Sequence, residues 1–211
     1  MKNHVLCIVL ALLVATGAYF AGARFGLGTM GSITPKRCGL RTAMRKLWSD
    51  HVWWTRDYLI TAIAGMPDVG PATNRLLKNQ EDIGAAVASY YGQEAGDALT
   101  KLLKEHIMIA AEVVKAAKEG NDAALKDADA RWHANADAIA QFLSSANPNW
   151  PYEAVKEMMY EHLKLTTEEA VARLKNDWET DIATFDKVFD EIMMMADTLT
   201  DGIAKQFPNK F

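Results

Sequence analysis

The sequence predicts an all-α protein, an antiparallel helical bundle of five to six helices preceded by an N-terminal hydrophobic helix. From Leu40 onward, apolar residues recur every three or four positions, which is the period of a helix with one buried face. No stretch shows the strict alternation of apolar and polar residues that predicts a strand. Half of the 211 residues are apolar and 24% are charged, a composition typical of a globular domain with a substantial core.

The first segment, residues 1–25, is predicted to be a membrane anchor or a signal peptide. Residues 3–23 contain no Asp, Glu, Lys or Arg, and their length suits either one membrane-spanning helix or a long signal peptide. We expect a single-pass anchor that attaches the protein to a membrane. The basic residues after it favour a cytoplasmic domain by the positive-inside rule, whereas a signal peptide would lead to secretion.

Residues 26–36, GLGTMGSITPK, are predicted to form a flexible linker because they are rich in Gly and contain Pro35. The helical bundle domain then occupies residues 37–211. The net charge of the chain is -4, and no basic stripe is present, so nucleic acid is excluded as a partner.

Gly, Pro and Asn residues separate the predicted helices, as expected where helices end. The predicted helices cover about 40–62, 72–89, 94–119, 122–145, a short stretch from 152, and 167–205. The sequence TTEE at 166–169 predicts a capping box in which Thr166 caps the last helix and Glu169 reaches back to it. No internal repeat is evident.

Three histidines fall on the predicted inner faces of three different helices. His51 lies four residues after Leu47, and His106 and His162 follow apolar residues at the same spacing. Asp181 occupies the inner face of the last predicted helix. Buried imidazoles and carboxylates are costly unless they find partners, and helical bundles commonly use such residues to hold a metal ion.

The sequence therefore predicts a metal site formed by His51, His106, His162 and Asp181. Nitrogen ligands with one carboxylate suit a divalent transition metal such as zinc, iron, copper or nickel. In the alternative, each histidine is satisfied separately, by a carbonyl, a carboxylate or Asn135, and no metal binds. Arg56 could also pair with Asp181 or Glu169, which would neutralise the carboxylate instead of leaving it for a metal.

Several stretches resemble a family of small bacterial all-helical proteins without an assigned function. They are LWSDHVWWTRDYLI, NRLLKNQEDIG, YYGQEAGDALTKLLKEHIMIA, ANPNWP, EHLKLTTEEAVARL and DGIAKQFPNKF. The resemblance covers about residues 40–211 and implies the helical fold and the matching positions His51, His106 and His162. Some members are labelled glycosyltransferase or kinase, but this sequence has no glycine-rich phosphate loop and no α/β alternation. The layout is also similar to hemerythrin-like and DinB-like metal bundles, by architecture only.

Three functions remain open at this stage, and the sequence assigns no reaction to any of them. The first is a membrane-tethered helical bundle that binds a metal ion through inward-facing histidines. The second is a structural or protein-interaction module without metal, which binds a protein partner or associates with itself. The third is a pocket for a small ligand or haem, lined by tryptophans and methionines.

Overall fold

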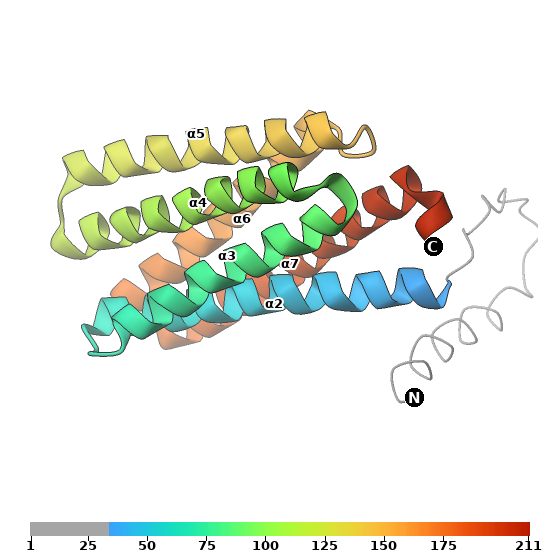
Figure 1. Cartoon of the computed structure of the whole chain (residues 1–211). Helices are drawn as coiled ribbons and strands as arrows, with labels where there is room; N and C mark the ends of the chain where they lie inside the picture. The colour runs from blue at the N-terminus through green and yellow to red at the C-terminus, as the bar shows by residue number, and fades with distance from the viewer. Residues whose placement is uncertain (1–33) are drawn as a thin grey trace, which may run out of the picture.

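The computed structural model describes residues 34–211, and these residues form six long α-helices and no strand. The helices are α2 (Pro35–Ala64), α3 (Val69–Tyr91), α4 (Gln93–Glu119), α5 (Asp122–Ala146), α6 (Tyr152–Leu174) and α7 (Trp178–Gln206), followed by a short 3-10 turn, Pro208–Lys210 (Figure 1). The predicted all-α bundle is confirmed for this part of the chain. The predicted anchor lies outside the described residues. None of the helices within residues 34–211 is long and apolar enough to cross a membrane.

The six helices form a closed ring of antiparallel neighbours. Each helix packs mainly against the helices before and after it in the chain, and α7 closes the ring by packing against α2 (Figure 1). Consequently α2, α4 and α6 run in one direction and α3, α5 and α7 in the other. The bundle can be described as three successive helical hairpins, α2–α3, α4–α5 and α6–α7.

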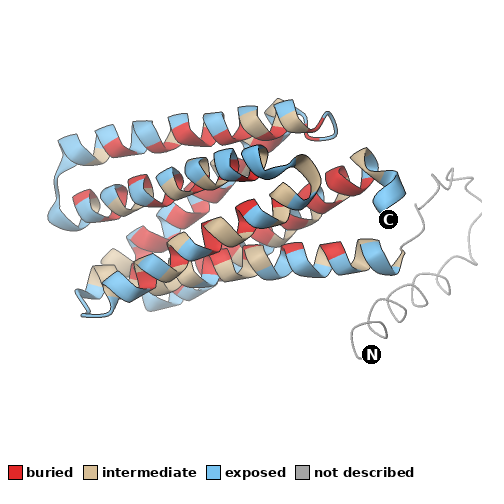
Figure 2. Cartoon of the chain, viewed as in Figure 1, coloured by how far each residue is buried: buried red, intermediate tan, exposed pale blue. Residues whose placement is uncertain are grey.

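The core lies inside this ring, where the buried faces of all six helices meet (Figure 2). Close approach of α3 and α4 depends on two glycines: a Cβ added to Gly84 or to Gly96 would lie 2.7 Å from the carbonyl oxygen of the other. A Cβ on Gly202 of α7 would likewise collide with the indole of Trp150. Small residues at these points let the backbone and a large aromatic ring pack without a gap.

The first helix begins earlier than the sequence predicts. Thr34 caps α2 by accepting a hydrogen bond from the backbone N–H of Arg37, at 3.2 Å, and Pro35 occupies the first turn, where a missing N–H costs nothing. The last residues of the predicted linker therefore belong to the helix and its cap. Arginines of α2 also pair with Asp197 and Asp201 of α7 along the partly exposed edge where the ring closes.

The predicted boundary between the last two helices is wrong. Thr166 and Glu169 do not cap a helix; they lie buried in the middle of α6, which continues to Leu174. The break comes at Asn176, whose φ is 59°, and the side chain of Asp177 then caps α7 by accepting from the N–H of Thr180. The pattern TTEE satisfies the local rule for a cap, but burial of Glu169 against Arg56 keeps this segment helical.

The predicted inner face of the last helix holds from Asp181 onward, where Asp181, Phe185 and Ile192 are buried in α7, but it fails just after the break at 175–177. Trp178, expected on that face, is 50% exposed at the start of α7.

Candidate functional site

The structure brings the three predicted histidines together in the middle of the bundle. His51 of α2, His106 of α4 and His162 of α6 are only 3%, 3% and 4% exposed. The ring centroids of His51 and His162 are 5.6 Å apart, and those of His106 and His162 are 6.5 Å apart. We call these three residues the histidine layer.

Each histidine bonds through Nδ1 to a side chain on the second helix of its own hairpin, and each partner lies 29 residues further along the chain. The pairs are His51–Gln80 at 3.3 Å, His106–Asn135 at 2.8 Å and His162–Glu191 at 3.0 Å. The described chain therefore contains a threefold repeat of one unit, although no repeat was evident from the sequence. Each hairpin delivers one imidazole to the layer and one polar side chain that orients it.

His106 is fully hydrogen-bonded as a neutral ring. The amide nitrogen of Asn135 donates to the carbonyl of Leu102 at 3.2 Å, so the amide oxygen faces His106 and accepts from its Nδ1–H. His106 Nε2 then accepts from the indole N–H of Trp132 at 3.1 Å. Burial lowers the pKa of His106 to about 3, with a smaller contribution from His162.

His51 has the opposite tautomer. The amide nitrogen of Gln80 faces the carbonyl of Leu76 at 2.8 Å and the side-chain oxygen of Asn79 at 3.2 Å, so the atom facing His51 Nδ1 is a donor, and its two hydrogens are shared among three acceptors. The proton of a neutral His51 ring therefore sits on Nε2. Burial lowers the pKa of His51 well below its ordinary value, and the neighbouring His162 and His106 lower it further.

Several polar atoms around the histidine layer are buried without a hydrogen-bond partner among the described residues. They are Gln80 Oε1, Glu191 Oε1, Thr166 Oγ1 and Trp48 Nε1. Gln80 and Glu191 are direct partners of layer histidines, Thr166 is one turn after His162, and the Trp48 ring lies 5.7 Å from that of His51. Native interiors rarely leave such atoms unpaired, so this part of the core has hydrogen-bonding capacity for something beyond the chain's own side chains.

The predicted fourth ligand, Asp181, lies in a separate cluster. Its carboxylate accepts from Arg56 Nη1 at 2.9 Å and from Arg173 Nη1 at 3.0 Å, and Arg56 also pairs with Glu169. We call Arg56, Glu169, Arg173 and Asp181 the arginine–carboxylate cluster. The alternative in which Arg56 neutralises Asp181 is the one observed. Burial raises the pKa of Glu169 to about 7, against the opposing effect of Arg56.

Within residues 34–211, no group of three or more His, Cys, Asp or Glu side chains is placed so that it could hold a metal ion. The reason is visible in the hydrogen bonds: Trp132 occupies Nε2 of His106, and two arginines hold Asp181. Metal binding at the layer requires the Trp132–His106 hydrogen bond to open.

Sequence reasoning missed Glu191 and missed Trp132 as a donor to His106, and it did not assign Gln80, a residue it considered as a possible partner in the site, to His51. The equal spacing of 29 residues is the signal that could have found two of them, because it connects each histidine to a polar residue in the next helix. The flanks of the histidines also repeat: an acidic residue precedes and an aliphatic residue follows each one.

Comparisons of the chain with protein-family models, with curated proteins and with solved structures find no match. Function must therefore be inferred from the residues of this chain.

Proposed function

We propose that the protein is a membrane-tethered helical bundle whose histidine layer binds one divalent transition metal ion. The ligands are the Nε2 atoms of His51, His106 and His162. The observation that supports this proposal is the threefold repeat, because each hairpin supplies one buried imidazole whose Nδ1 is held by an amide or a carboxylate. Histidines that ligate metals are almost always held in this way through their other nitrogen.

The spacing of the rings supports the same proposal. Imidazoles that share one zinc ion at Zn–N distances of about 2.0–2.1 Å have centroids roughly 5–6 Å apart. The pair His51–His162 is already at this spacing, at 5.6 Å, whereas His106–His162, at 6.5 Å, lies slightly beyond it. Metal binding would need three local changes: the Trp132 N–H leaves His106, His106 moves closer to His162, and the Gln80 amide gives up its bonds to Leu76 and Asn79 so that its Oε1 accepts from His51 Nδ1–H.

The electrostatics of the layer favour a cation. The lowered pKa values of His51 and His106 keep both rings neutral at pH 7, so their lone pairs do not have to compete with protons. Glu191 is a buried carboxylate whose other oxygen, Oε1, has no partner among the described residues. It supplies negative charge next to the proposed ion. Asp181 is left out of the revised ligand set because Arg56 and Arg173 hold it.

Metal analysis of the untagged full-length chain tests this proposal. We expect about one zinc, iron, copper or nickel ion per chain, and loss of most of it in His51→Ala, His106→Ala and His162→Ala. His133→Ala is the matched control, because His133 is a partly exposed histidine that bonds to the Asp129 carbonyl. Trp132→Phe should bind metal more tightly, since it removes the N–H that competes for His106.

Two results would overturn the proposal. One is a chain that purifies without metal and whose thermal midpoint does not change when zinc, nickel or cobalt is added. The other is equal metal loss in His133→Ala and in the layer variants.

A second candidate function, self-association, is favoured by the outer surface of α2 and α7. Trp53 and Ile182 are 54% and 58% exposed, and they line a shallow groove with Phe185 and Phe189. Static light scattering over a range of concentrations tests it. Ile182→Lys should reduce the mass if this surface pairs two copies, whereas Met108→Lys, at an exposed position of α4, should not. A constant monomer mass for the unmodified chain would exclude it.

A further inference from the structure

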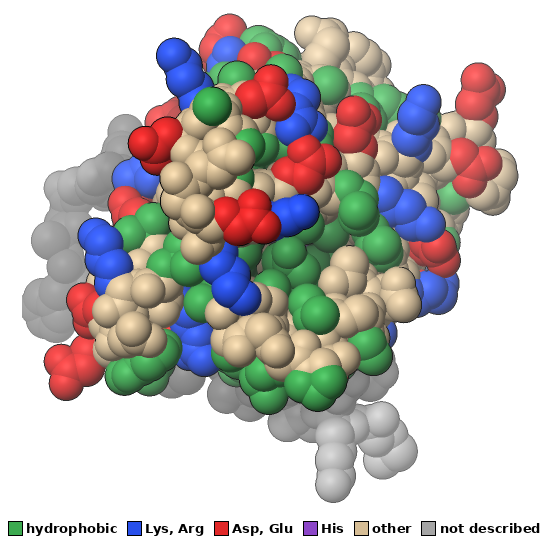
Figure 3. Space-filling view, turned by 90° about the vertical axis from the view of Figure 1, so that its left-hand side faces the viewer, with side chains coloured by type: hydrophobic (Ala, Val, Ile, Leu, Met, Phe, Trp, Pro, Cys, Tyr) green, Lys and Arg blue, Asp and Glu red, His purple; other side chains and the backbone are tan. Residues whose placement is uncertain are grey.

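The bundle contains an apolar pocket of about 100 Å³ between α2, α4, α5 and α6. We define this apolar pocket by the side chains of Leu59, Val114, Leu125, Trp132, Ala170 and Leu174. It reaches the surface near Val171, which is 38% exposed, at the end of the bundle where α2, α4 and α6 finish. Figure 3 shows this end, where hydrophobic side chains lie in the middle and along the lower edge of the view and charged side chains lie mainly above and to the sides.

The inner end of the apolar pocket adjoins the histidine layer. Thr55 and Thr166 line it, and each lies four residues after a layer histidine, which is one helical turn. Trp132, which bonds to His106, lines it as well. A molecule in the pocket would therefore sit one turn from the layer, with its other side toward the mouth.

One hydroxyl group in the pocket has no hydrogen-bond partner among the described residues. Thr55 donates to the carbonyl of His51 at 2.8 Å, and Thr167 donates to that of Leu163 at 2.8 Å, the usual bond of a threonine to the preceding turn of its helix. Thr166 occupies the position in α6 that Thr55 occupies in α2, yet its Oγ1 is buried without a partner among the described residues. An otherwise apolar wall thus presents one hydrogen-bonding group.

We propose that the apolar pocket binds a small, uncharged, mainly apolar molecule that carries one hydroxyl or carbonyl group, which bonds to Thr166. An apolar cavity of about 150 Å³ suffices to hold benzene. This pocket is smaller, at about 100 Å³, but it opens at the surface near Val171, so a single aromatic ring or a short aliphatic chain can extend into the mouth. Haem is far too large. The cavity lined by methionines and Trp48 on the other side of the layer, at about 20 Å³, has room for little more than one water molecule.

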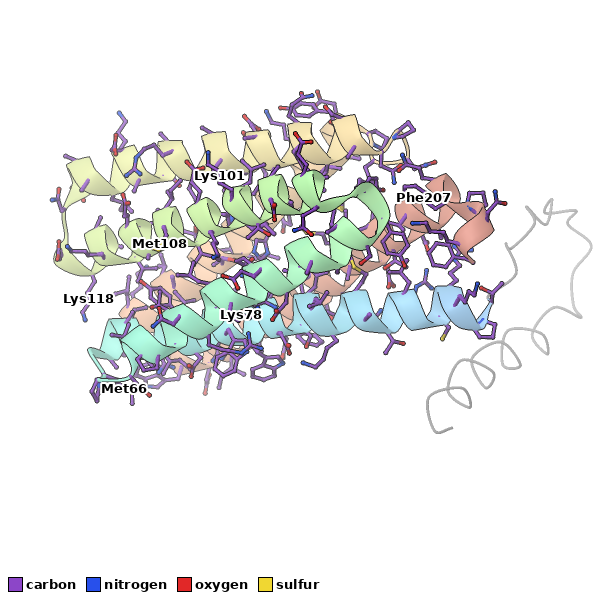
Figure 4. The ribbon with its side chains drawn as sticks, in the orientation of Figure 1. Met66, Lys78, Lys101, Met108, Lys118 and Phe207 are labelled. Atoms are coloured by element: carbon purple, nitrogen blue, oxygen red, sulfur yellow. The ribbon has the colours of Figure 1, made fainter. Side chains whose placement is uncertain are left out.

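The lining of the pocket favours an uncharged ligand. Lys118 at the end of α4 does not line the pocket, and its Nζ donates to the carbonyl of Ala62 of α2 at 2.8 Å (Figure 4). Tyr58 and Val171 supply apolar surface to the pocket. No Asp, Glu, Lys or Arg side chain of residues 34–211 lines the pocket, so a charged ligand would lose its hydration without gaining an ion pair.

Calorimetric titration of the full-length chain with phenol and with benzene tests this inference. The titration is carried out after treatment with a chelator, so that its outcome does not depend on the proposed metal. We expect both probes to bind and phenol to bind about three- to tenfold more tightly, which is the value of one neutral hydrogen bond. Thr166→Val should remove this preference and leave benzene binding unchanged.

Thr167→Val is the matched control, because it removes a hydroxyl from the same wall that is already bonded to Leu163. It should keep the preference for phenol. Ala170→Leu, or Ala117→Leu if the first variant does not fold, should fill the pocket and abolish binding of both probes. The inference is overturned if the folded chain binds neither probe, or if Thr166→Val and Thr167→Val change phenol binding equally.

Discussion

The histidine layer and the arginine–carboxylate cluster are both polar regions within one apolar bundle, and they are satisfied in different ways. In the cluster, Glu169 and Asp181 are almost fully buried, and each pairs with at least one arginine. In the layer, amides and one carboxylate hold three imidazoles, and polar atoms of Gln80 and Glu191 remain unpaired. A buried polar group that finds all its hydrogen-bond partners within the chain stabilises the fold. A buried polar group without such a partner can bind another molecule or an ion.

Burial acts on the two regions through the same physical cause but in opposite directions. It lowers the pKa values of His51 and His106 and raises that of Glu169, since in each case the charged form loses hydration. The cluster offsets this cost with arginines. The layer avoids it by keeping its bases neutral.

The largest expected loss of stability comes from a substitution that breaks the arginine–carboxylate cluster. Arg56→Met leaves Glu169 and Asp181 without their shared cation in the core, so it should lower the free energy of unfolding by about 3–5 kcal/mol in urea titrations. Arg131→Met is the control, because Arg131 pairs with Glu112 and Asp127 at the surface. It should cost less than about 1 kcal/mol. Equal losses in the two variants would show that the cluster does not stabilise the fold.

A smaller loss is expected in the layer. His106→Leu leaves the Asn135 amide oxygen and the Trp132 N–H buried and unpaired, so the free energy of unfolding should fall by about 2–4 kcal/mol. Adding Asn135→Leu should recover part of this loss, because an apolar pair needs no partner. His133→Leu should have little effect. If the double variant is less stable than the single one, Asn135 has a role other than holding His106.

Lowering the pH should change stability in opposite directions through the histidine layer and through the arginine–carboxylate cluster. Because the folded pKa of His106 is about 3, the unfolded chain takes up the proton first as pH falls below about 6.5, and stability is lost between pH 6.5 and 3. His51 contributes in the same direction. Glu169, with a folded pKa of about 7, acts oppositely: its contribution is full below about pH 4.5 and is lost as pH rises to 7.

The two histidines, His51 and His106, therefore have a larger effect than Glu169 alone. Together the three groups should lower the free energy of unfolding by about 1.4 kcal/mol for each pH unit as pH falls from 6.5 to 4.5. His106→Gln should remove about that slope, as measured by urea midpoints at several pH values. An unchanged slope in this variant would mean that His106 takes up a proton in the folded chain.

The smallest effect concerns the hydrogen bond that blocks the layer. Trp132→Phe should cost about 1 kcal/mol in the metal-free chain, since it removes one neutral donor while keeping an aromatic ring. Trp178→Phe, at an exposed position, should change stability by less than about 0.5 kcal/mol. A stabilising effect of Trp132→Phe would indicate that the His106–Trp132 bond is strained in the native bundle.

The helices and the inward direction of the histidines could be predicted from the sequence, because both follow from the 3.6-residue period. Where local and tertiary signals disagree, prediction failed. The TTEE segment has the residues of a capping box, yet Glu169 is drawn into the core by Arg56, a residue 113 positions away. The true stop, at Asn176, depends on a left-handed backbone conformation that the apolar pattern does not reveal.

The candidate site was predictable in its imidazoles but not in its carboxylate. The helical period of the apolar pattern places Asp181 on an inner face. It does not show whether an arginine or a histidine lies opposite Asp181 across the bundle. The choice between them depends on how the helices pack. Glu191 was missed because the inner face was traced through apolar residues, and a carboxylate next to Ile192 adds nothing to an apolar pattern.

The even number of helices in the ring has a practical consequence. Thr34 and the chain end after α7 lie at one end of the bundle, opposite the mouth near Val171 (Figure 1). A fluorescent fusion, an affinity handle or a sensor surface attached at the C-terminus would therefore leave the way into the bundle unobstructed, and small molecules could be screened on immobilised protein.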